Sequence, residues 1–269
     1  PPRAAFAAAA VTDKVRINPG NFVDPARTFK SLTYTDEEYE AELKRIHDAL
    51  VPFIDICREH HTAVRLGVNH GSLSDRIMSR YGNTAAGMVE SVMEFLRVFV
   101  EQKFYDVVIS MKASNVVVMV EAVRRVVAAM DAEDMHFPLH LGVTEAGEGE
   151  DGRIKSAVGI GALLADGIGD TVRVSLSEEP AAEIPVARHL VDYIGKKQGQ
   201  LMIPATACPS FDWLHPTRRE TEAVGNIGGT QVPVVISNRI NGESTICKNK
   251  DAQPDYIYIG GKMPKQTGA

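Results

Sequence analysis

The chain is poor in cysteine and in positive charge, and it lacks long apolar runs. Its three cysteines, Cys57, Cys208 and Cys247, form no C-x-x-C pair, which excludes a disulfide framework and a complete metal or iron–sulfur motif within the chain. The net charge of −6 argues against nucleic-acid binding through bulk charge, so any anion site must be local. No window approaches about 18 uninterrupted apolar residues. We therefore expect a cytoplasmic protein with no transmembrane helix and no nucleic-acid partner.

The composition is that of an ordinary globular protein. Of the 269 residues, 44% are hydrophobic and 24% are charged, which is enough to bury a substantial core. The N-terminal PPRAAFAAAAVTDK superficially resembles a signal peptide, but it has no initiator Met and a strand follows at once. We interpret it as a helix in a piece of a longer chain.

Five apolar strand candidates alternate with helix candidates. The strands are Lys14–Asn18, Ala63–Asn69, Asp106–Lys112, the apolar start of Pro138–Gly152, and Thr171–Leu176. Helices are predicted from a capping box at Thr35 and Glu38, after Asn83-Thr84, over Val116–Met130, over Lys155–Leu164 and near Ile184–Tyr193. Parallel neighbours need crossover connections, so this alternation predicts parallel βαβ units.

Two closures of such a sheet compete. An open doubly wound sheet concentrates ligand residues at one switch point, whereas a barrel collects them from every strand end. Here every strand candidate ends in polar residues, which favours an α/β fold of the (β/α)8 TIM-barrel type, with about five units present and the others before Pro1. The predicted domains are a partial substrate-binding barrel over 1–195, an irregular linker over 196–231 and the beginning of a second domain over 232–269, where VPVVIS and DYIYIG are strand candidates.

Four cations lie inside or at the end of otherwise apolar strands: Arg16, Arg65, Lys112 and Arg173. A single such cation usually has a structural role: it forms an ion pair, and its aliphatic stem is packed. Four on one face of a barrel would instead form a pocket for a small, highly charged anion such as a phosphate or diphosphate. Arg65 and Arg173 stand at the second or third position of their strands, so alternation leaves open whether each faces the lumen.

The stretch Pro138–Gly152, PLHLGVTEAGEGEDG, joins a short apolar strand to a loop with several carboxylates. Glu145 follows Thr144 directly at the strand mouth, where a carboxylate can act as general acid or base. It can equally cap the next helix or balance the cations, and spacing alone leaves these alternatives open. We expect the acidic residues further along, Glu148, Glu150 and Asp151, to be loop residues that face solvent.

Two other patterns favour structural roles. His136 and His140 are four residues apart, but they flank Pro138 and enter a strand, which does not favour a metal pair. Gly159-x-Gly161 does not follow a strand, so helix packing explains it better than dinucleotide binding.

Five consecutive motifs resemble one enzyme family. They are RINPGN (Arg16–Asn21), RLGVNHGSLSDRIMSRYG (Arg65–Gly82), SMKASN (Ser110–Asn115), HLGVTEAGEGEDGRIKSAVGIG (His140–Gly161) and DGIGDTVRVSLSEEP (Asp166–Pro180). In this order they resemble the 4-hydroxy-3-methylbut-2-enyl diphosphate synthases, in the longer form found in plants, chlamydiae and Bacteroidetes-like bacteria.

The resemblance implies an iron–sulfur oxidoreductase of the non-mevalonate isoprenoid pathway, built on a TIM barrel. Such enzymes reductively open 2-C-methyl-D-erythritol 2,4-cyclodiphosphate and eliminate water, which gives 4-hydroxy-3-methylbut-2-enyl diphosphate. Electrons come from ferredoxin or flavodoxin through a [4Fe–4S] cluster that a separate C-terminal domain holds. The resemblance further implies that the diphosphate is held by Arg16, Arg65, Asn69, Lys112 and Ser175, with Arg173 close by, and that Glu145, positioned by Thr144, is the acid/base residue.

The chain also departs from the family pattern. The first barrel strands and the cluster motifs are absent, and Phe211 stands where a second cysteine would follow Cys208. We therefore expect an internal fragment of the enzyme that has no metal ligands and is inactive alone. A binding-only fragment and a non-redox phosphate- or pterin-binding barrel are the alternatives, and the resemblance leaves a homodimer open.

Overall fold

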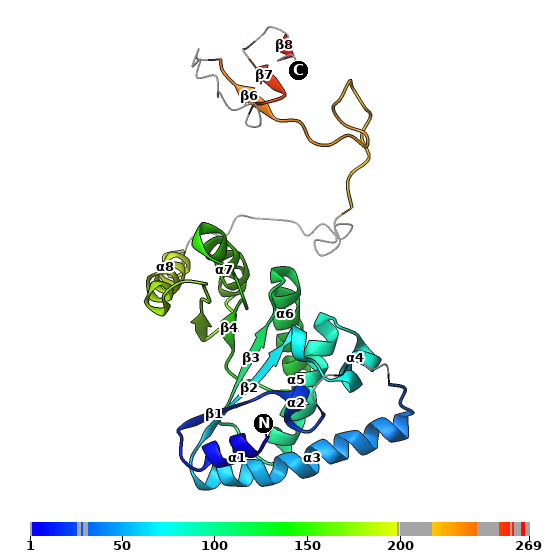
Figure 1. The fold of residues 1–269 in the computed structure, drawn as a ribbon, viewed down its shortest axis with the longest axis vertical. Helices are drawn as coiled ribbons and strands as arrows, with labels where there is room; N and C mark the ends of the chain where they lie inside the picture. The colour runs from blue at the N-terminus through cyan, green and yellow to red at the C-terminus, as the bar shows by residue number, and fades with distance from the viewer. Residues whose placement is uncertain are drawn as a thin grey trace. The chain divides into compact units, whose positions relative to one another are not determined.

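The computed structural model describes residues 2–25, 28, 32–197, 199, 217–240, 253–258 and 260, together with the backbone of 265–266. The chain divides into two compact units, Pro1–Ile203 and Pro204–Ala269, which are described separately. The first unit contains strands β1 to β5 and the helices that connect them (Figure 1).

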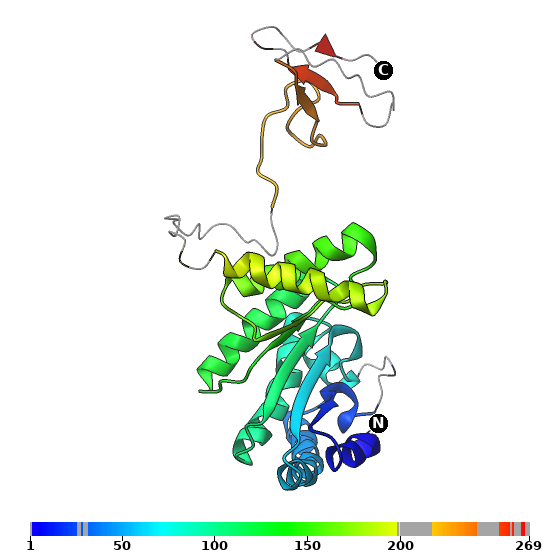
Figure 2. The same ribbon diagram turned by 90° about the vertical axis from the view of Figure 1, so that its left-hand side faces the viewer.

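The strands of the first unit are all parallel and follow one another in chain order. Strands β1 (Lys14–Ile17), β2 (Ala63–Asn69) and β3 (Val107–Lys112) form one sheet, and β4 (His140–Gly142) pairs with β5 (Thr171–Arg173). A parallel bridge between Ile109 and Leu139 connects β3 to the start of β4. Figures 1 and 2 show β1, β2 and β3 side by side. The predicted strands and their parallel βαβ order are confirmed, and β5 is shorter than predicted.

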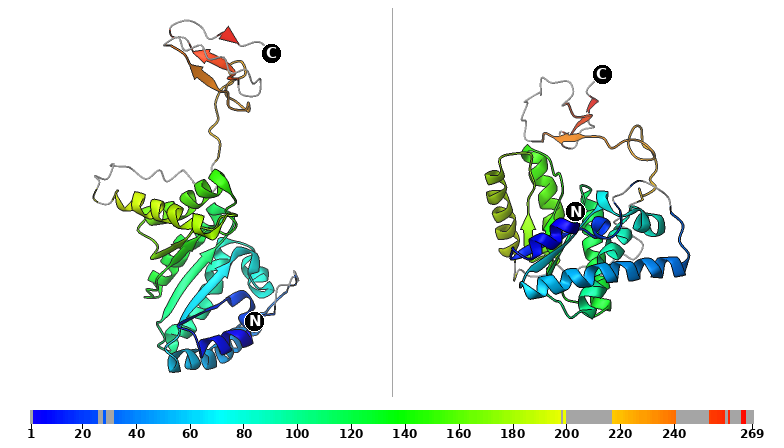
Figure 3. Two further views of the ribbon diagram at one scale, coloured as in Figure 1. Left: turned by 60° about the vertical axis from the view of Figure 1, so that its left-hand side comes forward. Right: turned by 60° about the horizontal axis from the view of Figure 1, so that its bottom comes forward.

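The helices form a continuous outer layer. Each contacts the next in the order α1 (Pro2–Ala9), α3 (Asp36–Glu59), α5 (Ala85–Glu101), α6 (Val116–Ala132), α7 (Gly149–Ala165) and α8 (Glu183–Gly195) (Figure 3). Helix α5 also contacts β2, α6 contacts β3, α7 contacts β4 and α8 contacts β5. Each crossover helix therefore lies against its own strand, as in a βα barrel.

The core lies between the strands and this helical layer. Alternate strand residues such as Leu66 and Ile109 are fully buried in the same cluster as the helix residues Leu50, Phe95 and Val123. Because side chains alternate along a strand, one face of the sheet supplies this apolar core and the other face is left to the residues between them.

Most helices begin where the sequence predicts. Thr35 and Glu38 form the predicted reciprocal capping box of α3, and Thr84 accepts from the Gly87 amide at the start of α5. Helix α3 continues through Pro52. Two short helices, α2 (Pro19–Phe22) and α4 (Asp75–Tyr81), are not among the predicted elements.

Helix α7 corrects one prediction. It begins at Gly149 rather than at Lys155, so Glu150 and Asp151 lie in its first turn and are not loop residues, although both are exposed. Glu148 is the N-cap residue. Carboxylates are favourable there because the helix dipole places partial positive charge at the N-terminus.

The second unit contains a small sheet. Strand β6 (Ile236–Asn238) is parallel to β7 (Tyr256–Tyr258), which is antiparallel to β8 (Lys265–Gln266). Strands β6 and β7 overlap the strand candidates VPVVIS and DYIYIG. Cys208, Phe211 and Cys247 lie outside the described residues.

Candidate anion-binding site

Strand register brings the predicted cations to one face of the sheet. Arg16 pairs with Arg65, and Asn69 pairs with Lys112. Register partners in a parallel sheet point to the same side, and Arg65 and Asn69 are four residues apart on β2, so these side chains share a face.

The same register extends to β4 and β5. The Ile109–Leu139 bridge places Gly142 beside Lys112, and Gly142 pairs with Arg173. Arg65 and Arg173 therefore point to the same side as Lys112, away from the helical layer. We call Arg16, Arg65, Lys112 and Arg173, on this side of the sheet, the cation face.

Two strand glycines give the cations room. A Cβ at Gly142 would lie 3.1 Å from Lys112 Cε and 3.3 Å from its Nζ, so the lysine side chain lies over this glycine. A Cβ at Gly67 would overlap Arg16 Nε. Neither glycine is among the site residues predicted from the sequence, although a glycine inside a strand often marks a close approach of this kind.

The cation face is not neutralised by the residues that the structure describes. None of its four cations forms an ion pair with another described residue. Burial, together with the positive charges of Arg173, Arg65 and Arg16, lowers the pKa of Lys112 to about 8, and the negative charge of Glu183 offsets part of this. Burial and Arg65 also lower the pKa of Arg16. The face therefore favours a ligand that carries negative charge.

Buried polar atoms without partners lie on the same face. Arg65 Nε, Thr144 Oγ1 and His140 Nε2 are buried and make no hydrogen bond in the described structure. Buried polar groups are nearly always paired, by protein, water or ligand. His140 is on the cation face because the Ile109–Leu139 bridge aligns it with Ser110, two residues before Lys112. Its ring was assigned no role from the sequence.

The remaining predicted residues lie at the C-terminal ends of β4 and β5. Thr144 follows Gly142 by two residues, and Ser175 stands between the buried Val174 and Leu176 on the side that it shares with Arg173. Glu145 is exposed and has a left-handed backbone with φ of 53°, which is uncommon for a residue other than glycine. The strand mouth thus holds a carboxylate on a constrained backbone next to the cation face.

A buried ionic cluster, which lies outside the cation face, holds the segment that follows the C-terminal end of β2. Arg76 of α4 binds Glu94 of α5 through two hydrogen bonds of 2.8 and 2.7 Å, and its Nε donates to Asp24 at 3.2 Å. Tyr39 of α3 donates to the same Glu94 at 2.5 Å. Burial opposes the charge of Arg76, but Glu94 and Asp24 outweigh it and raise the arginine pKa. The cluster fixes α4, which follows β2, between two long helices.

The described residues do not fit an iron–sulfur cluster. They contain no group of three His, Cys, Asp or Glu side chains placed to hold a metal ion. Cys57 is buried, and burial raises its pKa to about 11, whereas a metal ligand must be a thiolate. No described helix combines the length and apolar character that a membrane crossing requires.

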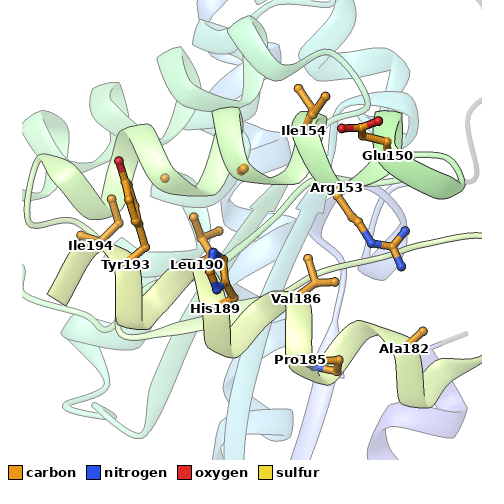
Figure 4. Close-up of a pocket in the computed structure, with 12 residues that line it drawn as sticks. Glu150, Arg153, Ile154, Ala182, Pro185, Val186, His189, Leu190, Tyr193 and Ile194 are labelled. Carbon is orange, nitrogen blue, oxygen red and sulfur yellow. The ribbon is translucent and has the colours of Figure 1, made fainter. Parts of the chain in front are cut away.

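A hollow of about 900 Å³ lies between α7 and α8 (Figure 4). Ile154, Val186 and Leu190 line it, with Arg153 and His189 among the polar side chains around them. It belongs to the helical layer and includes none of the cations described above. We therefore place the candidate site on the cation face and not in this hollow.

Comparison with known proteins agrees with the motifs. The family model described as the GcpE TIM-barrel domain matches residues 2–188. A relative from Bacteroides fragilis, named 4-hydroxy-3-methylbut-2-en-1-yl diphosphate synthase (flavodoxin), is 64% identical over 266 residues, which cover 99% of this chain and 42% of the relative. A relative of the same name from Protochlamydia amoebophila is 53% identical over 203 residues, which cover 76% of this chain and 31% of that protein.

The chain thus spans about two fifths of the length of its Bacteroides relative. The family match covers strands β1 to β5, helices α1 to α7, the start of α8 and the whole cation face. The predicted α/β fold of TIM-barrel type is confirmed, and the chain belongs to the GcpE family of TIM-barrel domains.

Proposed function

We propose that the cation face binds the diphosphate of 2-C-methyl-D-erythritol 2,4-cyclodiphosphate. We propose further that the whole protein converts this substrate reductively to 4-hydroxy-3-methylbut-2-enyl diphosphate. The observation that carries the proposal is a face with four cations that no described carboxylate pairs. The names of the relatives, which are synthases of this product, support the same assignment.

Each residue of the face has a chemical role in this proposal. Arginine offers a planar fork of donors that matches phosphate oxygens, whereas lysine acts as a point charge. Asn69 and Ser175 add neutral hydrogen bonds. The proposed diphosphate ligands are Arg16, Arg65, Asn69, Lys112, Arg173 and Ser175.

Glu145 is the proposed acid/base residue. Loss of a hydroxyl group as water requires a proton, which a carboxylic acid at the strand mouth can supply. The backbone of Glu145 is constrained, and the neighbouring Thr144 hydroxyl is buried without a partner, so it is available to bind a substrate oxygen. The carboxyl group would therefore act beside a diphosphate that the cation face holds.

We also propose that the whole protein works in the cytoplasm and carries a [4Fe–4S] cluster outside the described residues. When bound, this group would relay the two electrons of the reduction, one at a time, from the electron donor to the substrate. Flavodoxin is the proposed electron donor, after the names of the relatives, with ferredoxin as the alternative.

Calorimetric titration of the intact protein with the cyclodiphosphate tests the site. Each buried charge-assisted contact that is lost should cost about 1.5–3 kcal/mol, so the double variant Arg65→Ala/Lys112→Ala should bind far more weakly. Arg97→Ala is the control, because Arg97 forms its ion pairs with Glu90 and Glu133 on the helical layer. Equal affinity in the wild type and the double variant would overturn the assignment.

Turnover separates the synthase from a non-redox binding protein. With a chemical reductant, the intact wild type should form the product, whereas Glu145→Gln should retain substrate affinity and lose turnover. Binding without turnover in the reconstituted wild type would favour the non-redox alternative.

A further inference from the structure

His140 is the buried titratable group that the proposed function leaves unused. It lies on β4 with only 6% of its surface exposed. In the register of the sheet it occupies the row of Gly67, Ser110 and Thr171, directly beneath the row of Asn69, Lys112, Gly142 and Arg173. The ring therefore lies on the cation face, one row below Lys112 and Arg173 and one row above Arg65.

One ring nitrogen is held and the other is free to bind. Nδ1 lies 2.8 Å from the Thr171 hydroxyl, its register partner on β5. Nε2 is buried and has no hydrogen-bond partner among the described residues. An imidazole fixed at one nitrogen presents the other in a defined direction.

The charges around the ring are positive. Burial is the largest cause that lowers the pKa of His140 to about 4, and the positive charges of Lys112, Arg65, Arg173 and Lys14 lower it further, in that order. The nearby carboxylate of Asp170 accepts from the Leu139 amide, and that of Glu183 accepts from the Leu176 amide. A neutral ring among cations favours the tautomer with a lone pair at Nε2 and a proton at Nδ1, donated to Thr171.

We propose that His140 is a positioning residue of the anion site: its Nε2, which has no partner in this structure, accepts a hydrogen bond from the Lys112 ammonium when the flexible lysine side chain turns toward the ring. This inference rests on the proposed function. A carboxylate in the same place would also hold the lysine, but it would cancel one of the positive charges that attract the ligand. A neutral acceptor orients Lys112 and leaves the charge of the face intact.

Two substitutions in the intact protein distinguish the role of Nε2 from that of Nδ1. His140→Gln places an amide near the position of Nε2, whereas His140→Asn places one near Nδ1 and leaves no acceptor beneath Lys112. We expect the asparagine variant to lower the pKa of Lys112, measured by NMR with labelled lysine in the ligand-free protein. It should bind inorganic pyrophosphate and the cyclodiphosphate about tenfold more weakly, the loss expected for one hydrogen bond to a charged group. The glutamine variant should stay within about twofold of the wild type by the same reasoning.

The tautomer gives a readout that does not depend on ligand. With labelled histidine, nitrogen NMR should show Nε2 without a proton at neutral pH. A proton on Nε2, an unchanged Lys112 pKa in His140→Asn, or equal effects of the two substitutions would each overturn the proposal. If the wild type binds neither ligand, the proposed function fails, and the tautomer and the Lys112 pKa still decide the role of His140.

Discussion

Arg16 and Arg65 are register partners on adjacent strands, so two arginine side chains lie on the same face with no ion pair to a described carboxylate. Their mutual repulsion contributes to the lowered pKa of Arg16. A protein that holds two like charges in this way gives up stability for binding.

Arg16→Gln should therefore separate stability from affinity. The free energy of unfolding of the ligand-free intact protein should rise by about 0.5 kcal/mol or less, because Arg16 is exposed and solvent screens its repulsion with Arg65. Pyrophosphate binding should become weaker. Thermal melting with and without pyrophosphate measures both effects. Arg3→Gln on α1 is the control and should change neither quantity. Unchanged pyrophosphate affinity in Arg16→Gln would contradict the account of the cation face.

Gly142→Ala should displace Lys112. The added methyl group would lie 3.1 Å from Lys112 Cε and 3.0 Å from the Arg173 carbonyl oxygen, and the lysine stem is the more mobile of these neighbours. Pyrophosphate affinity should fall by about tenfold, as for the loss of one charged contact.

Gly161→Ala is a matched control on α7, where a Cβ would meet Leu190 at an ordinary 3.4 Å. This variant should bind pyrophosphate like the wild type in calorimetry. Similar affinities for Gly142→Ala and Gly161→Ala would show that Lys112 does not depend on the glycine.

Pyrophosphate affinity should depend on pH through Lys112. Its pKa of about 8 means that the ligand-free lysine loses its proton as the pH rises through 8, so affinity should decline from that pH upward. Calorimetry from about pH 7 to about pH 9.5 measures the decline. Lys112→Arg keeps its charge over this range and should flatten the profile. A wild-type profile as flat as that of the variant would contradict a lowered lysine pKa.

Glu94→Gln should destabilise the fold. The substitution leaves Arg76, 3% exposed, without its strongest partner, and breaking one side of a buried ion pair typically costs about 3–5 kcal/mol. Denaturant unfolding measures the loss. Glu90→Gln removes a carboxylate from an exposed pair with Arg97 and should cost under about 1 kcal/mol. Equal losses in the two variants would indicate that Arg76 is not held as described.

Acid should weaken the fold through His140. In the unfolded chain His140 takes up a proton near the ordinary histidine pKa of 6.5, whereas in the folded protein its pKa is about 4. The free energy of unfolding therefore falls as the pH drops from 6.5 to about 4. The contribution of His140 to the free energy of unfolding is at most roughly 3 kcal/mol. His140→Gln should show a shallower decline in denaturant unfolding between about pH 6.5 and about pH 4. An identical decline would assign the effect to other groups.

Local signals predicted much of this fold. The capping box at Thr35 and the N-cap at Thr84 act within one helical turn, so their positions can be found from neighbouring residues alone. The start of α7 was missed because its glycine-rich first turn has no apolar periodicity, and the helix that follows is apolar on several sides.

The site was harder to predict because it depends on register. A shift of one residue would have turned Arg65 and Arg173 toward the helices, and nothing within either strand excludes this. Arg76 and Asp24 are 52 residues apart, so their contact has no local signal. The sequence predicts no ligand-site role for His140, because the relation of this residue to Lys112 appears only when β3 and β4 are aligned.

The alternation along the strands has a consequence for protein engineering. On β2, Val64, Leu66 and Val68 belong to the buried cluster, while Arg65, Gly67 and Asn69 between them face the other side. Structural and ligand-binding roles are thus assigned to alternate positions of one short segment. A library that varies only every second residue of β1 to β5 could redesign the ligand preference of this barrel while leaving its hydrophobic packing untouched.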